Sequence, residues 1–115
     1  SYAAKVPNLT LNDLVMREAA ALDAPGLKPP REKTGPTDFG DVMHLAPGTV
    51  LRFKLVPEGT PSHTPEFLEA GRGEKAHAAA LLAAKVIAGT CAELIQDKEL
   101  MTRVREEFLT RKAAL

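Results

Sequence analysis

The sequence predicts an α/β protein that is rich in helices and contains one or two strands, and two patterns lead to this class. Residues 49–56, TVLRFKLV, alternate apolar and polar side chains around Leu51, Phe53 and Leu55, which is typical of a strand with one buried face. Residues 10–22, 73–96 and 98–115 instead repeat apolar side chains at helical spacing. A lone strand leaves its backbone groups without partners, so we expect the chain to belong to a larger α/β layer or to oligomerise.

The first expected helix, residues 10–22, carries Thr10 and Asp13 in a variant of the capping box. Its apolar stripe consists of Leu11, Leu14, Val15, Ala19 and Leu22. Residues 23–36 hold four prolines and two glycines, which predicts a loop. Residues 37–48 are expected to form a short helix or a turn-rich segment that ends at Pro47 and Gly48.

The long helix expected over residues 73–96 is apolar around most of its circumference, which predicts burial on more than one side. Lys85, Gly89 and Thr90 interrupt its apolar run and make it a poor membrane span. Asp97 is placed to cap the last helix. The inner stripe expected for that helix consists of Leu100, Met101, Val104 and Phe108.

The charge balance excludes several classes of partner. The 115 residues contain fifteen basic and fifteen acidic side chains, so the sequence offers no electrostatic reason to bind nucleic acid or an anionic membrane. Cys91 is the single cysteine and has no internal disulfide partner, which favours a reduced, cytoplasmic protein. The length of 115 residues fits one domain. Because its neighbours are apolar, we expect Cys91 to be a small buried side chain.

The three histidines do not form a recognisable metal motif, since CxxC, HExxH and HxD are all absent. His44 is expected to be structural and His77 to lie on a helix surface. His63 differs because it follows the expected strand and lies between Pro61 and Pro65, where α/β proteins place functional groups. Its position alone leaves a functional and a structural role open, and one imidazole cannot hold a catalytic zinc.

The segment GPTDFGD, residues 35–41, offers a second candidate. Gly35 and Pro36 allow a sharp turn, and Thr37 or Asp38 can cap a following helix. Asp38 could also orient a neighbouring group. Capping and a role in a site both stay open for this segment.

Three blocks in this order, GPTDFGDVMHLAPG, PEGTPSHTPEFLEAG and AHAAALLAAKVIAGTCAELIQDKEL, resemble the C-terminal part of the dinuclear-zinc amidohydrolases. This family includes aminoacylases, carboxypeptidase G-type enzymes and aminobenzoyl-glutamate hydrolases. The likeness is greatest to the branch of aminobenzoyl-glutamate hydrolases and aminoacylase-like dipeptidases. YAAKVPNLTLNDLVMREAAAL is similar to the helix by which such chains re-enter the catalytic domain after an inserted lid domain.

The resemblance implies that residues 1–115 are the C-terminal part of a three-layer α/β catalytic domain of the zinc-peptidase type. It implies that His63 is the last metal ligand and that Gly35, Thr37 and Asp38 line the substrate side. The complete enzyme would use two zinc ions to hydrolyse an amide bond of an N-acyl or aminobenzoyl amino acid or of a dipeptide. It would be a homo-oligomer, commonly a dimer through the lid domain.

The chain also departs from the family pattern. The HxD pair, the Glu-Glu motif with the general base and the lid histidine are missing from these residues. We therefore expect a truncated form, a proteolytic remnant or one piece of a split protein, inactive by itself. The alternative is a free-standing, non-catalytic interaction module that oligomerises through its uncovered surfaces.

Overall fold

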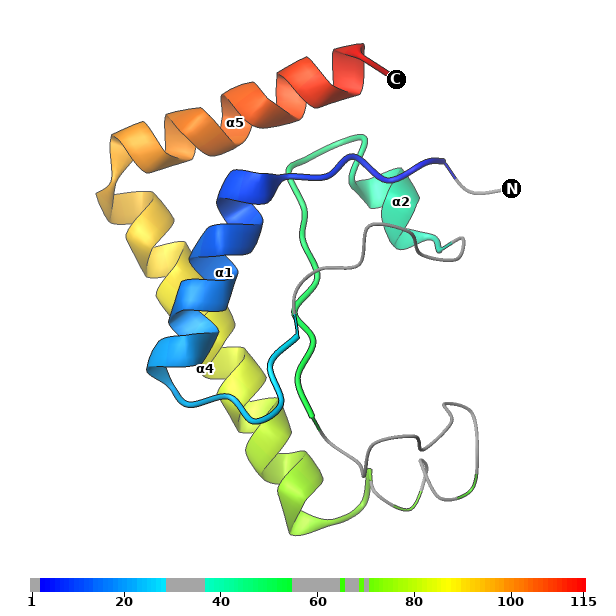
Figure 1. Ribbon diagram of the computed structural model, residues 1–115, viewed down its shortest axis with the longest axis vertical. Coiled ribbons are helices and arrows are strands. Elements are labelled where there is room, and N and C mark those ends of the chain that lie inside the picture. The colour runs from blue at the N-terminus through cyan, green and yellow to red at the C-terminus, as the bar shows by residue number, and fades with distance from the viewer. Residues whose placement is uncertain (1–2, 29–36, 55–64, 66–68, 70) are drawn as a thin grey trace.

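The computed structural model describes residues 3–28, 37–54, 65, 69 and 71–115. Four helices carry this part of the chain: α1 over Leu9–Ala21, α2 over Phe39–Val42, α4 over Glu74–Gln96 and α5 over Lys98–Ala113. Figure 1 shows α1 lying along α4, with α5 crossing near the start of α1. Each of α1, α4 and α5 packs against the other two.

Two clusters of buried side chains form the core, and α5 contributes to both. The first joins Leu11 and Leu14 of α1 to Leu100 and Val104 of α5, with Val15 and Leu94 packed against it. The second joins Val6 and Met43 to Phe108, with Phe39 beside them. Of the expected stripe on α5, Leu100, Val104 and Phe108 are buried as predicted, whereas Met101 is exposed.

The α/β prediction is wrong for the described residues, because they contain helices and no strand or sheet. Residues 49–54 are extended, but they exchange only two backbone hydrogen bonds with the loop beside them. Lys54 N–H donates to the Pro25 carbonyl at 2.7 Å, and Lys28 N–H donates to the Arg52 carbonyl at 3.2 Å. Residues 55 and 56 of the expected strand lie outside the described residues.

The loop beside residues 49–54 is chemically unsuited to be a partner strand. Pro25 has no backbone N–H to donate, and Gly26 adopts a φ of +56°, which is outside the extended region. A Cβ at Gly26 would lie 2.6 Å from the Lys54 Cβ, so the close approach of the two segments requires glycine. The absent N–H of Pro25 and the left-handed backbone of Gly26 therefore interrupt any regular ladder between this loop and residues 49–54.

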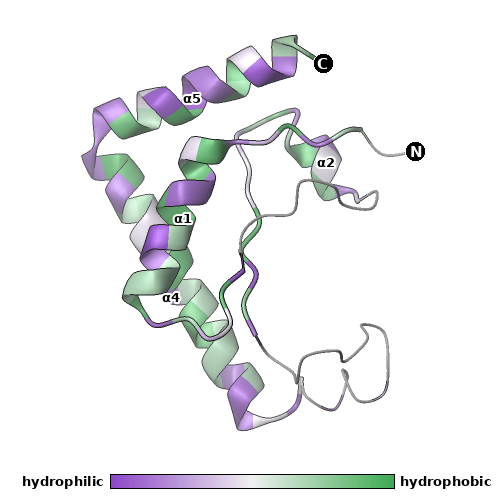
Figure 2. Cartoon of the chain, in the orientation of Figure 1, coloured by the Kyte–Doolittle hydropathy of each residue, from purple (hydrophilic) through white to green (hydrophobic). Residues whose placement is uncertain are grey.

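Helix α4 carries far more apolar surface than its neighbours cover. Among its described residues only Val86 and Thr90 are buried, so the prediction of burial on more than one side is wrong for this chain. Leu81, Ile87 and Ile95 are exposed, and apolar residues run along the length of α4 in Figure 2. Alanines at 80, 84 and 88 and Cys91 continue the same uncharged surface, and all of them are exposed.

By length and composition alone, α4 could cross a membrane, with a mean hydropathy of 1.7 in its most apolar window. This differs from the expectation that Lys85, Gly89 and Thr90 make the helix a poor membrane span. The core helix of a larger protein passes the same test, so this property does not assign α4 to a membrane.

The start of α1 is capped by Asn8 and not by Thr10, so the predicted capping box is wrong. The Asn8 side-chain oxygen accepts from Leu11 N–H at 3.0 Å, and its amide donates to the Val104 carbonyl of α5 at 2.8 Å. Asn8 is buried, and both ends of its amide are paired. At the other corner Asp97 caps α5 as predicted, because its carboxylate accepts from Leu100 N–H at 3.0 Å.

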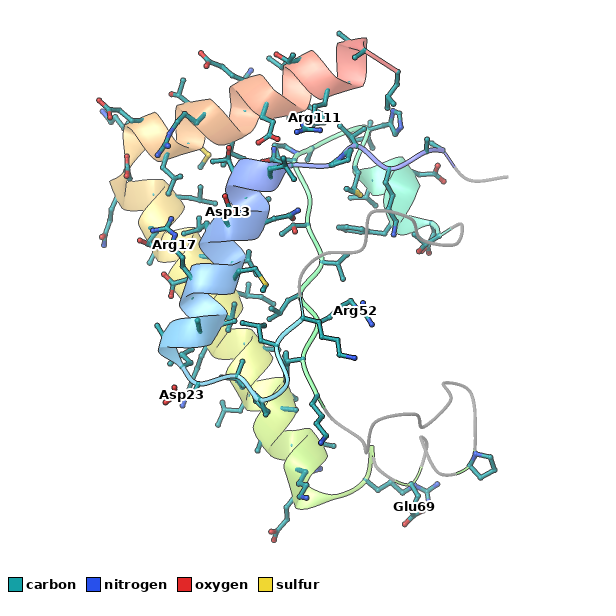
Figure 3. All side chains as sticks on the ribbon, viewed as in Figure 1. Asp13, Arg17, Asp23, Arg52, Glu69 and Arg111 are labelled. Atoms are coloured by element: carbon teal, nitrogen blue, oxygen red, sulfur yellow. The ribbon has the colours of Figure 1, made fainter. Side chains whose placement is uncertain are left out.

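Glu107 of α5 holds the first turn of α1 with three hydrogen bonds. Its carboxylate accepts from Leu9 N–H at 2.9 Å, from Thr10 N–H at 2.8 Å and from the Thr10 hydroxyl at 2.8 Å. Arg111, which lies on the side of α5 that faces the start of α1 (Figure 3), donates to Glu107 at 2.8 Å. Partial burial raises the pKa of Glu107, but the hydrogen bonds from Thr10, Leu9 and Arg111 outweigh it and leave the pKa below its usual range.

We predict that Glu107→Gln lowers the free energy of unfolding by about 1 to 2 kcal/mol at pH 7, because a neutral amide replaces an anion at a helix N-terminus. A lowered pKa in the folded state means that the carboxylate stabilises the fold above the ordinary pKa of glutamate. That contribution is lost as the pH falls through the lowered pKa of Glu107. Urea unfolding at several pH values between 3 and 7 measures the difference.

Glu106→Gln is the matched control, because Glu106 is its exposed neighbour on the same helix. It should change stability little at any pH. Equal stabilities of the Glu107→Gln variant and the parent chain at pH 7 would contradict the role given to this carboxylate.

Candidate functional site

Of the residues expected in a substrate site, the structure places Thr37 and Asp38 in the turn that leads into α2. The Thr37 carbonyl accepts from Gly40 N–H at 3.0 Å, and its hydroxyl oxygen accepts from Phe39 N–H at 3.4 Å. The Asp38 carboxylate makes no capping bond to the helix, and among the described residues it accepts from the Thr37 hydroxyl alone, at 3.3 Å. Asp38 is exposed, so its carboxylate stays open to solvent beside the turn.

The turn is held in place by the N-terminal segment, which runs across α2. Ala3 N–H donates to the Asp41 carboxylate at 2.8 Å, and the His44 Nε2 lies 2.6 Å from the Ala4 carbonyl. A Cβ at Gly40 would collide with the Ala3 carbonyl, so only glycine allows the segment to lie this close. These contacts fix α2 against the start of the chain.

Gly35 and His63 lie outside the described residues, so the structure does not test whether they meet Thr37 and Asp38. Among the residues that are described, no three His, Cys, Asp or Glu side chains come together as a metal site. Zinc in a catalytic site takes three or more protein ligands. The described residues therefore do not hold a metal ion by themselves.

The remaining histidines and the cysteine have simpler roles. A carbonyl oxygen can only accept, so His44 donates from Nε2 to Ala4 and is structural, as expected. His77 is exposed on α4, also as expected. Cys91 is exposed, so the prediction of a buried side chain is wrong. It lies on the uncovered surface of α4, where no described element packs over it.

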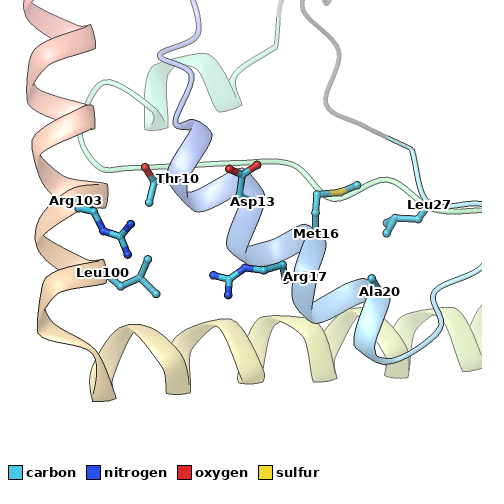
Figure 4. A pocket seen from close by; sticks show the side chains of 8 residues that line it. All are labelled: Thr10, Asp13, Met16, Arg17, Ala20, Leu27, Leu100 and Arg103. Atoms are coloured by element: carbon cyan, nitrogen blue, oxygen red, sulfur yellow. The ribbon is translucent and has the colours of Figure 1, made fainter.

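A groove between α1 and α5 was not foreseen from the sequence. It has a volume of about 640 Å³ and opens to solvent. Arg17, Arg103 and Leu100 line the part next to α5, and Met16 and Leu27 line the part farther from α5 (Figure 4). No sequence signal joins these residues, because Arg17 and Arg103 lie on different helices, far apart in the chain.

Two carboxyl groups meet where α1 lies on α4. The absence of a side chain at Gly89 makes room for the Glu18 carboxyl, which is hydrogen-bonded to Glu93. That hydrogen bond needs a proton on one of the two groups, so it raises the pKa of Glu18; partial burial and repulsion from Glu93 raise it further, and Arg17 opposes them. Paired carboxyls occur in some acid–base sites, but this pair lies at the contact between α1 and α4.

Comparison with known proteins links the chain to enzymes that are hydrolases by name. It is 33% identical over 75 residues to the Xaa-Arg dipeptidase of Homo sapiens, covering 65% of this chain and 17% of the enzyme. It is 37% identical over 71 residues to one of the subunits of the p-aminobenzoyl-glutamate hydrolase of Escherichia coli (strain K12), covering 62% of this chain and 15% of that subunit. The similarity supports a peptidase or amidohydrolase family.

The comparisons support the family resemblance at that level and do not point to a specific member. The chain spans about one sixth of the length of these curated relatives. No family model matches the chain. No solved structure matches it either.

We predict that Glu18→Gln raises the free energy of unfolding by about 0.5 kcal/mol at pH 7, because it removes the repulsion between Glu18 and Glu93. A raised pKa in the folded state means that Glu18 stabilises the fold only while it is protonated. This contribution is lost as the pH rises through the raised pKa. The two proteins should be equally stable near pH 4, as measured by urea unfolding; a Glu18→Gln variant less stable than the parent at pH 7 would contradict this account.

Proposed function

We propose that this chain is the C-terminal part of the catalytic domain of a metal-dependent amidohydrolase or peptidase. The complete enzyme would cleave an amide bond of an N-acyl or aminobenzoyl amino acid or of a dipeptide. The observation that carries the proposal is the similarity to two amide-cleaving hydrolases over most of this chain and a small part of theirs. The names of those enzymes supply the class of bond.

The surface of α4 supports the assignment of this chain to a larger domain. A helix of 23 residues with an uncharged, exposed apolar surface is unusual in a free-standing small protein. The extended residues 49–54 likewise have backbone groups that only two hydrogen bonds join to a neighbouring segment. Both features are expected of a piece whose remaining layers lie in other residues of the enzyme.

Each residue proposed for the site can supply one kind of contact to a substrate or a metal ion. Asp38 offers an exposed carboxylate that no helix cap occupies, and Thr37 fixes it through a hydroxyl hydrogen bond. His63 is proposed as a metal ligand, and Gly35, two residues before Thr37 in the sequence, as a substrate-side residue. Bound zinc would supply Lewis acidity and an activated water. Because the described residues hold no set of three ligands, the metal would need ligands from outside them.

The same uncovered surface also favours a second candidate, a non-catalytic module that forms a homo-oligomer through α4. The two functions differ in what buries Cys91. In the enzyme, residues outside this chain cover it in a single polypeptide; in the module, a second copy of this chain covers it.

We predict that the Cys91 thiol reacts with a maleimide at least about 10-fold faster in the dilute 115-residue chain than in the full-length gene product, because the covering layer excludes the reagent. The measurement is the labelling rate by mass spectrometry at several protein concentrations. Equal rates in the two proteins would contradict a covered α4. A rate in the short chain that falls with rising concentration would favour the oligomerising module.

The enzymatic proposal is tested in the full-length protein with a panel of N-acyl amino acids and dipeptides in the presence of Zn²⁺. We predict that His63→Ala lowers kcat/KM by more than about 100-fold and reduces the bound zinc, because a metal ligand is lost. His77→Ala is the matched control, since His77 is an exposed histidine on α4. Undiminished turnover and zinc content in His63→Ala would remove His63 from the site.

A further inference from the structure

Two arginine side chains, one from α1 and one from α5, line the groove between these helices. Arg17 projects from α1 and Arg103 from α5, and Figure 4 shows both guanidinium groups pointing into the gap between the helices. Neither forms an ion pair with any residue that the structure describes, whereas Arg72 and Arg111 do. Two positive charges on one groove repel each other, and an anion between them would relieve that repulsion.

The acid in the lining does not serve as that anion. Asp13 points away from the Arg17 guanidinium in Figure 4, although the two residues are one turn apart on α1. Two arginines and one aspartate leave a net charge of +1 on the lining (2 − 1 = 1). This charge suits a monoanion better than a dianion, which Asp13 would repel.

Apart from Thr10, the rest of the lining is apolar. Met16 is half-buried on α1, Leu27 is half-buried in the loop that follows α1, and Leu100 is buried in the first turn of α5. The groove volume of about 640 Å³ falls within the range of small-molecule sites. A ligand that fits both parts of the lining has one charged end and one apolar end.

We propose that this groove binds a small amphipathic monocarboxylate. Its carboxylate lies between Arg17 and Arg103, since the planar guanidinium group matches carboxylate geometry with paired hydrogen bonds. Its apolar chain begins beside Leu100 and extends along α1 toward Met16 and Leu27. The proposal does not depend on the metal site or on the enzymatic activity, because every residue in it belongs to α1, α5 or the loop after α1.

The test is a titration of the 115-residue chain with sodium hexanoate at low ionic strength, followed by ¹H–¹⁵N and methyl NMR. We expect a Kd on the order of 1 to 10 mM, with the largest shifts at the Leu100 and Met16 methyl groups. Acetate lacks the apolar chain and hexan-1-ol lacks the charge, so each should bind at least about 5-fold more weakly. Inorganic phosphate should bind no better than acetate.

Arg17→Gln and Arg103→Gln should each weaken hexanoate binding about 5-fold, as expected for exposed charge pairs, and raised salt should weaken the parent in the same way. Arg105→Gln is the matched control, because Arg105 lies on α5 outside the groove and should leave the Kd unchanged. Arg17→Lys keeps the positive charge but loses the planar guanidinium group that can donate two hydrogen bonds to one carboxylate. It should therefore weaken binding less than Arg17→Gln.

Three results would overturn the proposal. The first is unchanged hexanoate binding in the double Gln variant with an intact circular dichroism spectrum. The second is equal binding of hexan-1-ol, which would indicate an apolar patch without charge recognition. The third is equal binding of phosphate, which would indicate a general anion site. If a Gln variant does not fold, the Arg17→Lys and salt titrations decide the question.

Discussion

The carboxylate of Glu107 and the buried amide of Asn8 join the first turn of α1 to α5, and the rest of the structure depends on this junction. An α-helix begins with N–H groups that have no partner within the helix, and here the Leu9 and Thr10 groups are satisfied from another helix. Asn8 satisfies a third N–H and binds the Val104 carbonyl in the same contact. Because the junction holds the first turn of α1 against α5, it also fixes the position of α1 along α4. The groove lies between α1 and α5, next to this junction.

Helix α4 shows the opposite situation, since most of its apolar surface has no partner in the described residues. Hydrophobic burial is the main favourable term in folding, so an amphipathic helix is normally covered on each apolar side. A chain that spans about one sixth of its curated relatives can leave such a helix half covered without contradiction. The uncovered surface of α4, the exposed Cys91 and the sparsely hydrogen-bonded segment 49–54 therefore have one common explanation under the proposed function.

Side chains that could bind a ligand lie in two separate parts of the described structure. The turn at Thr37 and Asp38 precedes α2 and offers one carboxylate that the helix does not use. The groove offers two guanidinium groups beside an apolar wall. Family resemblance drew attention to the first, because a motif of adjacent residues carries it. Nothing in a linear pattern could indicate the second, because it exists only where two helices meet.

The sequence by itself determined the helices at 9–21, 74–96 and 98–113 to within about two residues at each end, the cap at Asp97 and the similarity to hydrolases. These features depend on spacing along the chain and on local hydrogen bonds, which a linear pattern records. Tertiary structure alone decided that residues 49–54 do not join a sheet, that Asn8 binds the Val104 carbonyl, that Cys91 is exposed and that Arg17 and Arg103 line the same groove. Each of these outcomes depends on which groups lie across from a residue in space: a proline without an N–H, a carbonyl from a distant helix or no covering layer.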